Sequence, residues 1–328
     1  WIFIEYCFLT INFHSWWHPK YYQRSVFNLP ESKLSLEAQE LINLGRVKAS
    51  QKKIVIAGLA RNIRKRLEFN IPILEQIGSK FQDYQIVIFE NDSTDGTRDL
   101  IKSWSSQNKH VVLLDCCDLG DCDCQLKEKN LYDLGAMTQA RIDKMAFFRN
   151  RYLEYIQTNL SDYDYMLVID LDIEGSTNID GIYHTIAHRN WDMVALNGRT
   201  QLPGTFGTLT NAYDALAYRS INEIKATENI NFGNWFQKWW QMNRLITSSG
   251  EKMVPVKSAF NGAGLYQIKS ILGTKYYTLS NSEHIGLHQS MSDANHGAIF
   301  INPLWLGYMG YQGPRGNLGS FWKSIVSN

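Results

Sequence analysis

The sequence has little proline, almost no excess charge and no long apolar run. Only 7 of its 328 residues are proline and 23 are glycine, which excludes a collagen-like or proline-rich chain. Lys and Arg number 33 against 32 Asp and Glu, so a nucleic-acid partner held by bulk positive charge is not expected. The hydrophobic content of 44% excludes disorder as the main state and suffices for one large domain or two smaller ones.

Apolar residues open the chain, but their run is too short for a membrane span. Residues 1–13, WIFIEYCFLTINF, contain Glu5, and a spanning helix needs roughly 20 apolar residues. We therefore expect a packed terminal segment. Because the first residue is Trp1 rather than Met, the alternative is the end of a membrane anchor whose beginning is missing. Membrane association would come only through that missing segment.

Cysteine is scarce, and its spacing does not predict a zinc site. Four of the five cysteines fall in CCDLGDCDC at 116–124. This string lacks the paired C-x-x-C of a zinc site, and adjacent cysteines rarely bind one metal together. Disulfides and free thiols both remain open.

Short apolar runs alternate with longer helical patterns, which predicts a largely parallel sheet. Each run is nearly continuous in Val, Ile and Leu, as in strands that are buried on both faces. The strand–helix–strand spacing indicates βαβ units with helices on both sides. The expected strands are 53–58, 84–90, 110–115, 165–171 and 192–198, and the expected helices are 64–80, 94–107, 138–158 and 178–189. The alternation resumes more weakly at 254–268, in a helix at 283–294 and in a strand at 297–306.

Two carboxylates follow the strand expected at 165–171. Ligands bind outside the carboxyl ends of strands in open α/β sheets, so chemistry is expected there. If the strand continues through Asp170 and Asp172, both side chains point to one face. Such a pair suits a hard divalent cation such as Mg²⁺ or Mn²⁺. The alternative is a solvated strand end, because D-x-D pairs are common.

A polar cluster, Glu90, Asn91 and Asp92, follows the strand at 84–90. Ser93 and Thr94 can cap the next helix. An ordinary strand–turn–helix junction would need one capping residue, so the cluster exceeds that need. Its carboxylate and amide groups are suited to reading a base edge or a ribose.

One charge falls on the apolar stripe of the helix expected at 138–158. Arg149 lies seven residues after Ile142, and a charge on a buried face must find a partner. A structural salt bridge, or a side chain that reaches solvent, would satisfy this need. The functional alternative is a phosphate clamp, because a guanidinium fits two phosphate oxygens. The D-x-D pair favours that alternative.

The segment 281–291, NSEHIGLHQSM, begins a late helix. Ser282 can cap it, and Glu283 and His284 fall in its first turn. His284 and His288 share one face because they are four residues apart. Three interpretations stay open: metal ligation by a histidine, base catalysis by Glu283, or a capped helix with surface histidines. The other histidines lack such context and are interpreted as structural.

Together these strings resemble the GT-A glycosyltransferases, a nucleotide-sugar-dependent class with a Rossmann-like sheet. Their order is AGLARN at 57–62, ENDSTDGT at 90–97, the helix with Arg149, the D-x-D strand, the acidic position 283 and the strand GAIFINP. The segments RIDKMAFFRNRYLEYI, YDALAYR and AFNGAGLY are most similar to fungal capsule-associated α-1,3-mannosyltransferases and related viral and microbial enzymes. The resemblance covers about residues 52–310.

The resemblance implies an α/β fold with a mostly parallel sheet flanked by helices. The main domain would span 52–310, with a nucleotide-binding half at 52–198 and an acceptor-side half with aromatic-rich insertions at 199–310. Residues 1–51 would form an extension that packs on this core, and 311–328 a tail. The localisation stays open between the cytoplasm and the Golgi lumen.

The resemblance also implies roles for the matching positions. The nucleotide sugar would contact Ala57, Gly58, Arg61, Glu90, Asp92, Arg149 and Asp170. The metal, Mn²⁺ or Mg²⁺, would be held by Asp170 and Asp172, with His284 or His288 as a further ligand. Inverting members often have an acidic pair where this chain has Glu283 and His284. The base role therefore falls to Glu283, or to no residue if the enzyme retains configuration. Asp172 and Glu283 are the expected catalytic residues.

The implied reaction transfers a hexose or similar sugar from a UDP- or GDP-linked donor to a glycan hydroxyl. Trp235, Trp239 and Asn261 are expected on the acceptor side, although the spacing of the two tryptophans also fits a packed helix face. A sugar-nucleotide nucleotidyltransferase and a catalytically inactive carbohydrate-binding protein are the alternatives, because fold alone does not establish function.

Overall fold

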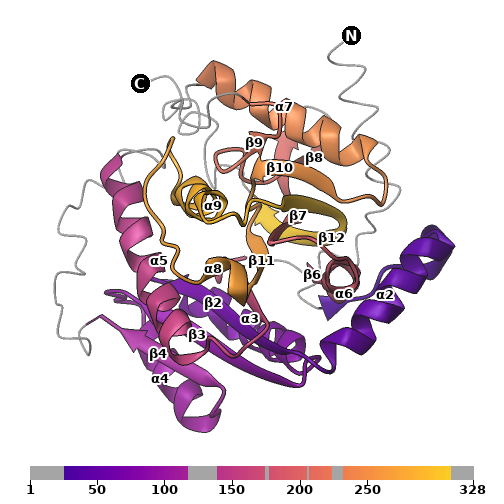
Figure 1. The fold of residues 1–328 in the computed structure, drawn as a ribbon. Helices are drawn as coiled ribbons and strands as arrows, with labels where there is room; N and C mark the ends of the chain where they lie inside the picture. The colour runs from indigo at the N-terminus through magenta and orange to yellow at the C-terminus, as the bar shows by residue number, and fades with distance from the viewer. Residues whose placement is uncertain (1–25, 117–138, 174–176, 205–206, 224–231, 312–328) are drawn as a thin grey trace.

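The computed structural model describes residues 26–116, 139–173, 177–204, 207–223 and 232–311. These residues form one mixed sheet with helices on both faces (Figure 1), which confirms the predicted α/β fold class. The strands are β1 (Val26–Phe27), β2 (Lys53–Ala60), β3 (Asp83–Glu90), β4 (Val111–Asp115), β5 (Tyr165–Ile169), β6 (Thr177–Asn178), β7 (Met193–Gly204), β8 (Gly207–Ala212), β9 (Arg219–Ser220), β10 (Val254–Ser258), β11 (Ala263–Gln267) and β12 (Ile299–Tyr311). The helices are η2 (Glu31–Lys33), α2 (Leu36–Ala49), α3 (Arg64–Gly78), α4 (Thr97–Gln107), α5 (Gln139–Asn159), α6 (Ile179–Ala187), α7 (Phe232–Ser248), α8 (Ile268–Ile271) and α9 (Glu283–Asp293).

The sheet runs in the order β1-β6-β12-β7-β11-β5-β2-β3-β4. Strands β5, β2, β3 and β4 are parallel neighbours, so their carboxyl ends meet at one edge. Strand β11 lies antiparallel between β5 and β7. This pairing brings the turn that precedes β11 beside the end of β5.

The central strands are buried on both faces, as their apolar sequences predict. In β2, Val55 and Ala57 belong to one core cluster, whereas Ile54 and Ile56 belong to another. This division follows from the alternation of side chains along a strand. Helix α5 contributes to the first cluster through Tyr152 and its neighbours, and α3 and α6 contribute to the second.

Residues 26–51 pack on this core. Strand β1 pairs in parallel with β6, and the Leu29 amide donates to Asp180 Oδ2 at 2.6 Å. Helix α2 lies along α6 (Figure 1), where Lys48 Nζ donates to the Ala187 carbonyl at 2.9 Å. Residues 1–25 and 312–328 lie outside the described part of the chain.

Several boundaries differ from those predicted. Helix α4 begins at Thr97 rather than 94, with Gly96 as its N-cap at φ 85°. The Thr97 amide bonds to Asp95 Oδ1 at 3.0 Å, so neither Ser93 nor Thr94 caps the helix. Strands β7 and β12 extend to Gly204 and Tyr311 because they pair with each other, and β7 also pairs with β8.

None of the helices in the described residues combines the length and apolar character that crossing a bilayer requires. Cys116 is disulfide-bonded, and the other four cysteines lie outside the described residues.

Candidate functional site

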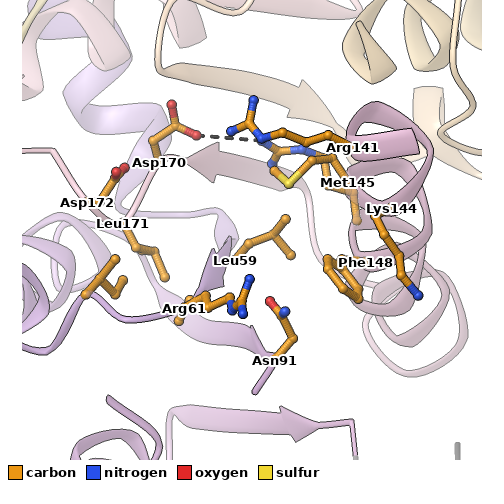
Figure 2. Close-up of a pocket in the computed structure, with 13 residues that line it drawn as sticks. Leu59, Arg61, Asn91, Arg141, Lys144, Met145, Phe148, Asp170, Leu171 and Asp172 are labelled. Atoms are coloured by element: carbon orange, nitrogen blue, oxygen red, sulfur yellow. Dashed lines mark ion pairs between the residues drawn. The ribbon is translucent and has the colours of Figure 1, made fainter. Parts of the chain in front are cut away.

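A pocket of about 230 Å³ lies at the carboxyl edge of the parallel strands, beside α5 (Figure 2). Its walls come from the end of β2, the segments that follow β2, β3 and β5, and one face of α5. The lining residues are Leu59, Ala60, Arg61, Ile63, Asn91, Arg141, Lys144, Met145, Phe148, Arg149, Asp170, Leu171 and Asp172. Of the residues predicted to bind donor or metal, Arg61, Arg149, Asp170 and Asp172 therefore meet in one cavity.

Asp170 and Asp172 lie on a turn after β5, not within the strand as predicted. The strand ends at Ile169, and the Asp170 amide donates to the Gly262 carbonyl at 3.0 Å. The chain then turns so that Leu171 packs over Gly58, where a Cβ atom would lie 2.6 Å from Leu171 Cγ. The burial of Leu171, rather than strand alternation, therefore places the two carboxylates on either side of it.

Asn70 of α3 holds this turn. Its buried Nδ2 donates to the Leu171 and Ile173 carbonyls, each at 2.9 Å. Two satisfied carbonyls leave the turn little freedom. Both acidic side chains are thereby kept at the pocket wall.

Arg149 projects from the buried face of α5 into the acidic side of the site. Its Nε donates to Glu283 Oε1 at 2.8 Å, and its Nη2 lies 3.6 Å from Asp170 Oδ1. Its Nη1 donates a hydrogen bond to the Tyr152 hydroxyl at 3.2 Å. The buried charge of Arg149 is therefore paired, as a charge on an apolar face requires. Arg149 also lines the pocket.

Four carboxylates lie within electrostatic reach of one another around Arg149. Burial raises the pKa of Asp170 to about 8. Arg149 opposes this shift, whereas three neighbouring carboxylates add to it: Asp172, Asp214 and Glu283. Burial, followed by the charge of Glu283, raises the pKa of Asp214 to about 6. The cluster has more acidic groups than this one arginine balances, and a further cation would relieve it.

Sequence reasoning did not single out Asp214. It follows β8 with a φ of 60°, and its carboxylate accepts hydrogen bonds from the amides of Leu216 and Ala217. No strand end, capping pattern or metal spacing marks this residue. The only signal was the acid within YDALAYR, a segment that had entered through the family resemblance alone.

The pocket lining also contains several basic side chains. Arg141, Lys144 and Arg149 lie on the face of α5 that lines the pocket, and Arg61 follows β2. Sequence reasoning missed the first two, which precede Arg149 by eight and five residues. Four basic side chains against two acids in the lining create a field that attracts an anion.

Asn91 carries a buried polar group that faces no protein partner. It lines the pocket with 3% of its surface exposed, and its Nδ2 atom has no hydrogen-bond partner. Buried donors are rarely left unsatisfied in folded proteins. Its position indicates an acceptor atom of a ligand.

The other polar residues after β3 brace the neighbouring loop. The Asn62 amide donates to Ser93 Oγ at 3.0 Å, and the Thr94 amide donates to Asn62 Oδ1 at 2.8 Å. The Arg64 amide donates to Asp95 Oδ2 at 3.0 Å. The polar excess in ENDSTDGT thus holds the loop that carries Arg61 as well as facing the pocket.

Several predicted donor-binding residues lie outside the pocket lining. Glu90 is fully buried and accepts from Arg98 Nε at 2.7 Å. Ala57 and Gly58 lie within β2, directly before Leu59, the first residue of that strand that lines the pocket. Asp92 is also outside the lining, and its Oδ2 atom lies 3.9 Å from Arg61 Nη2.

The two late histidines differ in their surroundings. His284 stacks on Phe260 with ring centroids 3.7 Å apart, and neither of its ring nitrogens has a hydrogen-bond partner. His288 shares hydrogen bonds with Ser258 Oγ at 2.7 Å and with the Tyr266 hydroxyl at 3.1 Å. Its two nitrogens are thereby occupied, and the structure does not offer them to a metal. Ser282 is the N-cap of α9 but makes no side-chain capping bond.

Of the three residues predicted for the acceptor side, the structure describes only the Asn261 side chain. Asn261 is fully buried before β11, with its Nδ2 donating to the Leu196 carbonyl at 2.8 Å and its Oδ1 unpartnered. Trp235 and Trp239 belong to α7, but their side chains lie outside the described part of the structure.

The donor set at the pocket fits a cation held jointly with a ligand. In the described ranges, no three His, Cys, Asp or Glu side chains are arranged to hold a metal. Asp170 and Asp172 supply two carboxylates. Mg²⁺ and similar hard cations are commonly bound by one or two carboxylates together with substrate phosphates. The pair therefore suits such a shared cation and not a cage made by protein alone.

No protein-family model matches the sequence, and a search of curated proteins finds no match. Among solved structures, the fold is similar to the mannosyltransferase PcManGT of Pyrobaculum calidifontis in complex with GDP-Man and Mn²⁺, with a TM-score of 0.39 and 10% identity over 81% of this chain and 66% of that chain. It is also similar to TarS 1–349 of S. aureus, with a TM-score of 0.41 and 11% identity over 78% of this chain and 60% of that one. A third is GalNAc-T7 with UDP, GalNAc and Mn²⁺, with a TM-score of 0.46 and 9% identity over 81% and 45%. This chain thus spans less than two thirds of each.

Proposed function

We propose that this protein is a metal-dependent glycosyltransferase of the GT-A class. It moves a hexose or similar sugar from a nucleoside-diphosphate sugar to a hydroxyl group of a glycan acceptor. The observation that carries the proposal is a single pocket whose lining contains Asp170 and Asp172 together with four basic side chains. An acid pair alone would suit a cation, and basic side chains alone would suit an anion. Their combination suits a diphosphate that shares a cation with the protein.

Asp170 and Asp172 would hold the Mn²⁺ or Mg²⁺ ion. When bound, the ion supplies Lewis-acid stabilisation of the departing diphosphate. His284 remains a candidate for a further ligand because neither of its buried ring nitrogens has a hydrogen-bond partner, although its Nε2 lies 3.7 Å from Glu283 Oε1. His288 is left out of the proposed set because its nitrogens bond to Ser258 and Tyr266.

The basic side chains and Asn91 would bind the donor. Arg149 reaches the diphosphate from α5, and Arg61 reaches it from the loop after β2. The Asn91 amide, whose Nδ2 has no protein acceptor, donates to the nucleoside. Leu59, Ile63 and Phe148 supply the apolar part of the lining and exclude water around these contacts.

The reaction breaks the bond between the anomeric carbon and the diphosphate oxygen. Arg149 stabilises the charge that develops on the leaving group, in a position fixed beforehand by Glu283 and Asp170. An acceptor hydroxyl oxygen forms the new bond to the anomeric carbon and loses its proton. In an inverting reaction, Glu283 accepts that proton.

A ligand screen followed by product analysis tests the proposal. The melting temperature is measured with nucleoside diphosphates and nucleotide sugars, each with and without Mn²⁺. One nucleotide class is expected to raise it in the presence of Mn²⁺, because a ligand of the native state stabilises that state. The donor so identified should then release a nucleoside diphosphate when an acceptor glycan is added. Release of pyrophosphate from a nucleoside triphosphate and a sugar 1-phosphate would instead indicate a nucleotidyltransferase. The absence of both stabilisation and turnover with every donor would contradict the proposal.

A further inference from the structure

Arg219 is a fully buried arginine whose hydrogen bonds go to two separate chain turns. Its Nη1 atom donates to the Leu216 carbonyl at 2.9 Å and to the Tyr218 carbonyl at 2.7 Å. Its Nη2 atom donates to the Ser280 carbonyl at 2.8 Å and to the Ser280 hydroxyl at 2.5 Å. None of its surface is exposed to solvent.

Each of these turns carries an acidic residue of the candidate site. The first contains Asp214, whose carboxylate accepts from the amides of Leu216 and Ala217. The second lies three residues before Glu283, the first residue of α9. Arg219 therefore connects two carboxylates that are far apart in sequence but belong to one electrostatic cluster.

Both turns contain backbone conformations that ordinary residues adopt rarely. Asp214, Ser280 and Asn281 have φ values of 60°, 52° and 65°. Such conformations persist when the surrounding structure holds them in place, and they gather at functional sites. The four hydrogen bonds of Arg219 supply such a restraint on both sides.

The chemistry of the side chain explains why an arginine is placed there. Burying a guanidinium is costly unless its donors are satisfied. The planar fork can donate in two directions at once, whereas a lysine ammonium is a point charge on a flexible stem. Glu223 Oε1 lies 3.8 Å from the Arg219 Nε atom and balances part of its charge. Two loops joined by a rigid fork move as one unit.

We infer that Arg219 is a positioning residue, which holds Asp214 and Glu283 in the arrangement required for the acceptor step. This inference rests on the proposed glycosyltransferase activity. Arg219 lies outside the lining of the donor pocket, but Glu283 also binds Arg149, which lines it. We therefore expect Arg219 to have its larger effect on the transfer step and a smaller one on donor binding. Its loss should lower kcat by a larger factor than it weakens donor binding.

The test compares Arg219→Met and Arg219→Lys with the wild type, at a temperature at which all three are folded by circular dichroism. At saturating donor and acceptor, kcat should fall at least about tenfold, which corresponds to about 1.4 kcal/mol in barrier height. The Kd of the Mn²⁺–nucleoside diphosphate complex should rise by a clearly smaller factor than kcat falls. The Arg219→Lys variant should have a similarly low kcat, because a lysine ammonium lacks the planar guanidinium that donates to both turns. Ser280→Ala removes one hydroxyl contact and keeps the carbonyl contact, so its kcat should remain nearer the wild-type value.

Hydrogen exchange supplies a readout that does not depend on activity. In Arg219→Met, amides in 214–218 and in 280–284 should lose protection together, while those of β2 and β3 should not. Wild-type kcat in a folded Arg219→Met protein would overturn the inference, as would parallel losses of kcat and donor affinity, or unchanged protection of both turns. A wild-type protein that transfers no sugar would instead count against the proposed function. In that case, joint loss of protection would still show that Arg219 couples the turns.

Discussion

Arg149 and Glu283 are 134 residues apart in sequence and form a buried hydrogen-bonded ion pair of 2.8 Å. The pair joins α5, which lines the donor pocket, to the first residue of α9. It thus couples the proposed diphosphate contact to the proposed base. Because Arg149 also lies 3.6 Å from Asp170, one guanidinium touches both proposed functions of the site.

Removing one member of this pair should cost more than removing both. Arg149→Met leaves the Glu283 charge buried without its partner, which typically costs about 3–5 kcal/mol. Adding Glu283→Gln should restore part of the free energy of unfolding, because the unpaired charge at position 283 is then removed. Urea denaturation of both single variants and the double variant measures the coupling. Strictly additive losses would show that the two side chains do not stabilise each other.

Asp172→Asn should abolish metal-dependent transfer without unfolding the protein. Asp162→Asn is a matched control, because both carboxylates are exposed and each pairs with a basic side chain: Asp172 with Arg66 at 3.3 Å and Asp162 with Lys53 at 2.7 Å. Only Asp172 lines the pocket. We expect at least about a 100-fold loss of turnover in Asp172→Asn, or about 2.7 kcal/mol, and none in the control. EDTA should inhibit the wild type and Mn²⁺ should restore it. Full turnover by folded Asp172→Asn would remove the metal argument.

Binding of Mn²⁺ should depend on pH through Asp170. A metal ligand must be deprotonated, and burial raises the pKa of Asp170 to about 8. Below that pKa the ion competes with a proton, so affinity should rise by up to about tenfold per pH unit between pH 6 and 8. Calorimetric titration with MnCl₂ and a nucleoside diphosphate at pH 6, 7 and 8 measures this trend. Constant affinity over that range would mean that Asp170 is ionised throughout.

The sequence predicted the part of the site that depends on local pattern. Apolar runs gave the parallel strands, and the interruption of an apolar stripe marked Arg149 as a charge with a buried partner. Its partner, Glu283, could not be identified from spacing, because that contact depends on how α9 packs against α5. The set of basic side chains was incomplete for a related reason: Arg141 and Lys144 become pocket residues only once one face of α5 is set against the sheet edge.

Other features depended on tertiary contacts that no local pattern encodes. The D-x-D pair was expected on a strand, but Leu171 packs over Gly58 and ends the strand at Ile169. Asp214 reaches the acidic cluster through a turn with a positive φ. Glu90 is the last residue of the buried strand β3, yet Arg98 of α4 binds its carboxylate outside the pocket lining.

His184 should make stability fall at acidic pH. It is buried in α6 and shares a contact of 3.2 Å with Asn302 Nδ2. Burial, and next the charge of His188, lower the pKa of His184 to about 4. Its ordinary value is about 6.5, so the unfolded chain takes up a proton between pH 6.5 and 4 that the folded protein does not. The free energy of unfolding therefore keeps its full value above pH 6.5 and falls by up to about 3 kcal/mol as the pH drops towards 4. Urea denaturation at several pH values should show a shallower acid dependence in His184→Gln. An identical slope in that variant would exclude His184 as the source.

Asn91 offers a way to separate ligand binding from stability. Its Nδ2 is buried at the pocket without a protein partner, so Asn91→Ala removes an unsatisfied donor and should leave the free energy of unfolding of the unliganded protein unchanged or higher. In the complex, the same change removes a hydrogen bond worth about 1 kcal/mol, which weakens nucleotide binding roughly fivefold. Asn159→Ala is the control, because the exposed Asn159 side chain donates only to the Tyr155 carbonyl within α5. The two free energies come from urea denaturation and from titration with a nucleoside diphosphate and Mn²⁺. A loss of stability with no loss of affinity would show that the Asn91 side chain serves the fold and does not bind the ligand. A loss of affinity with no loss of stability is the result that a residue serving only packing cannot give.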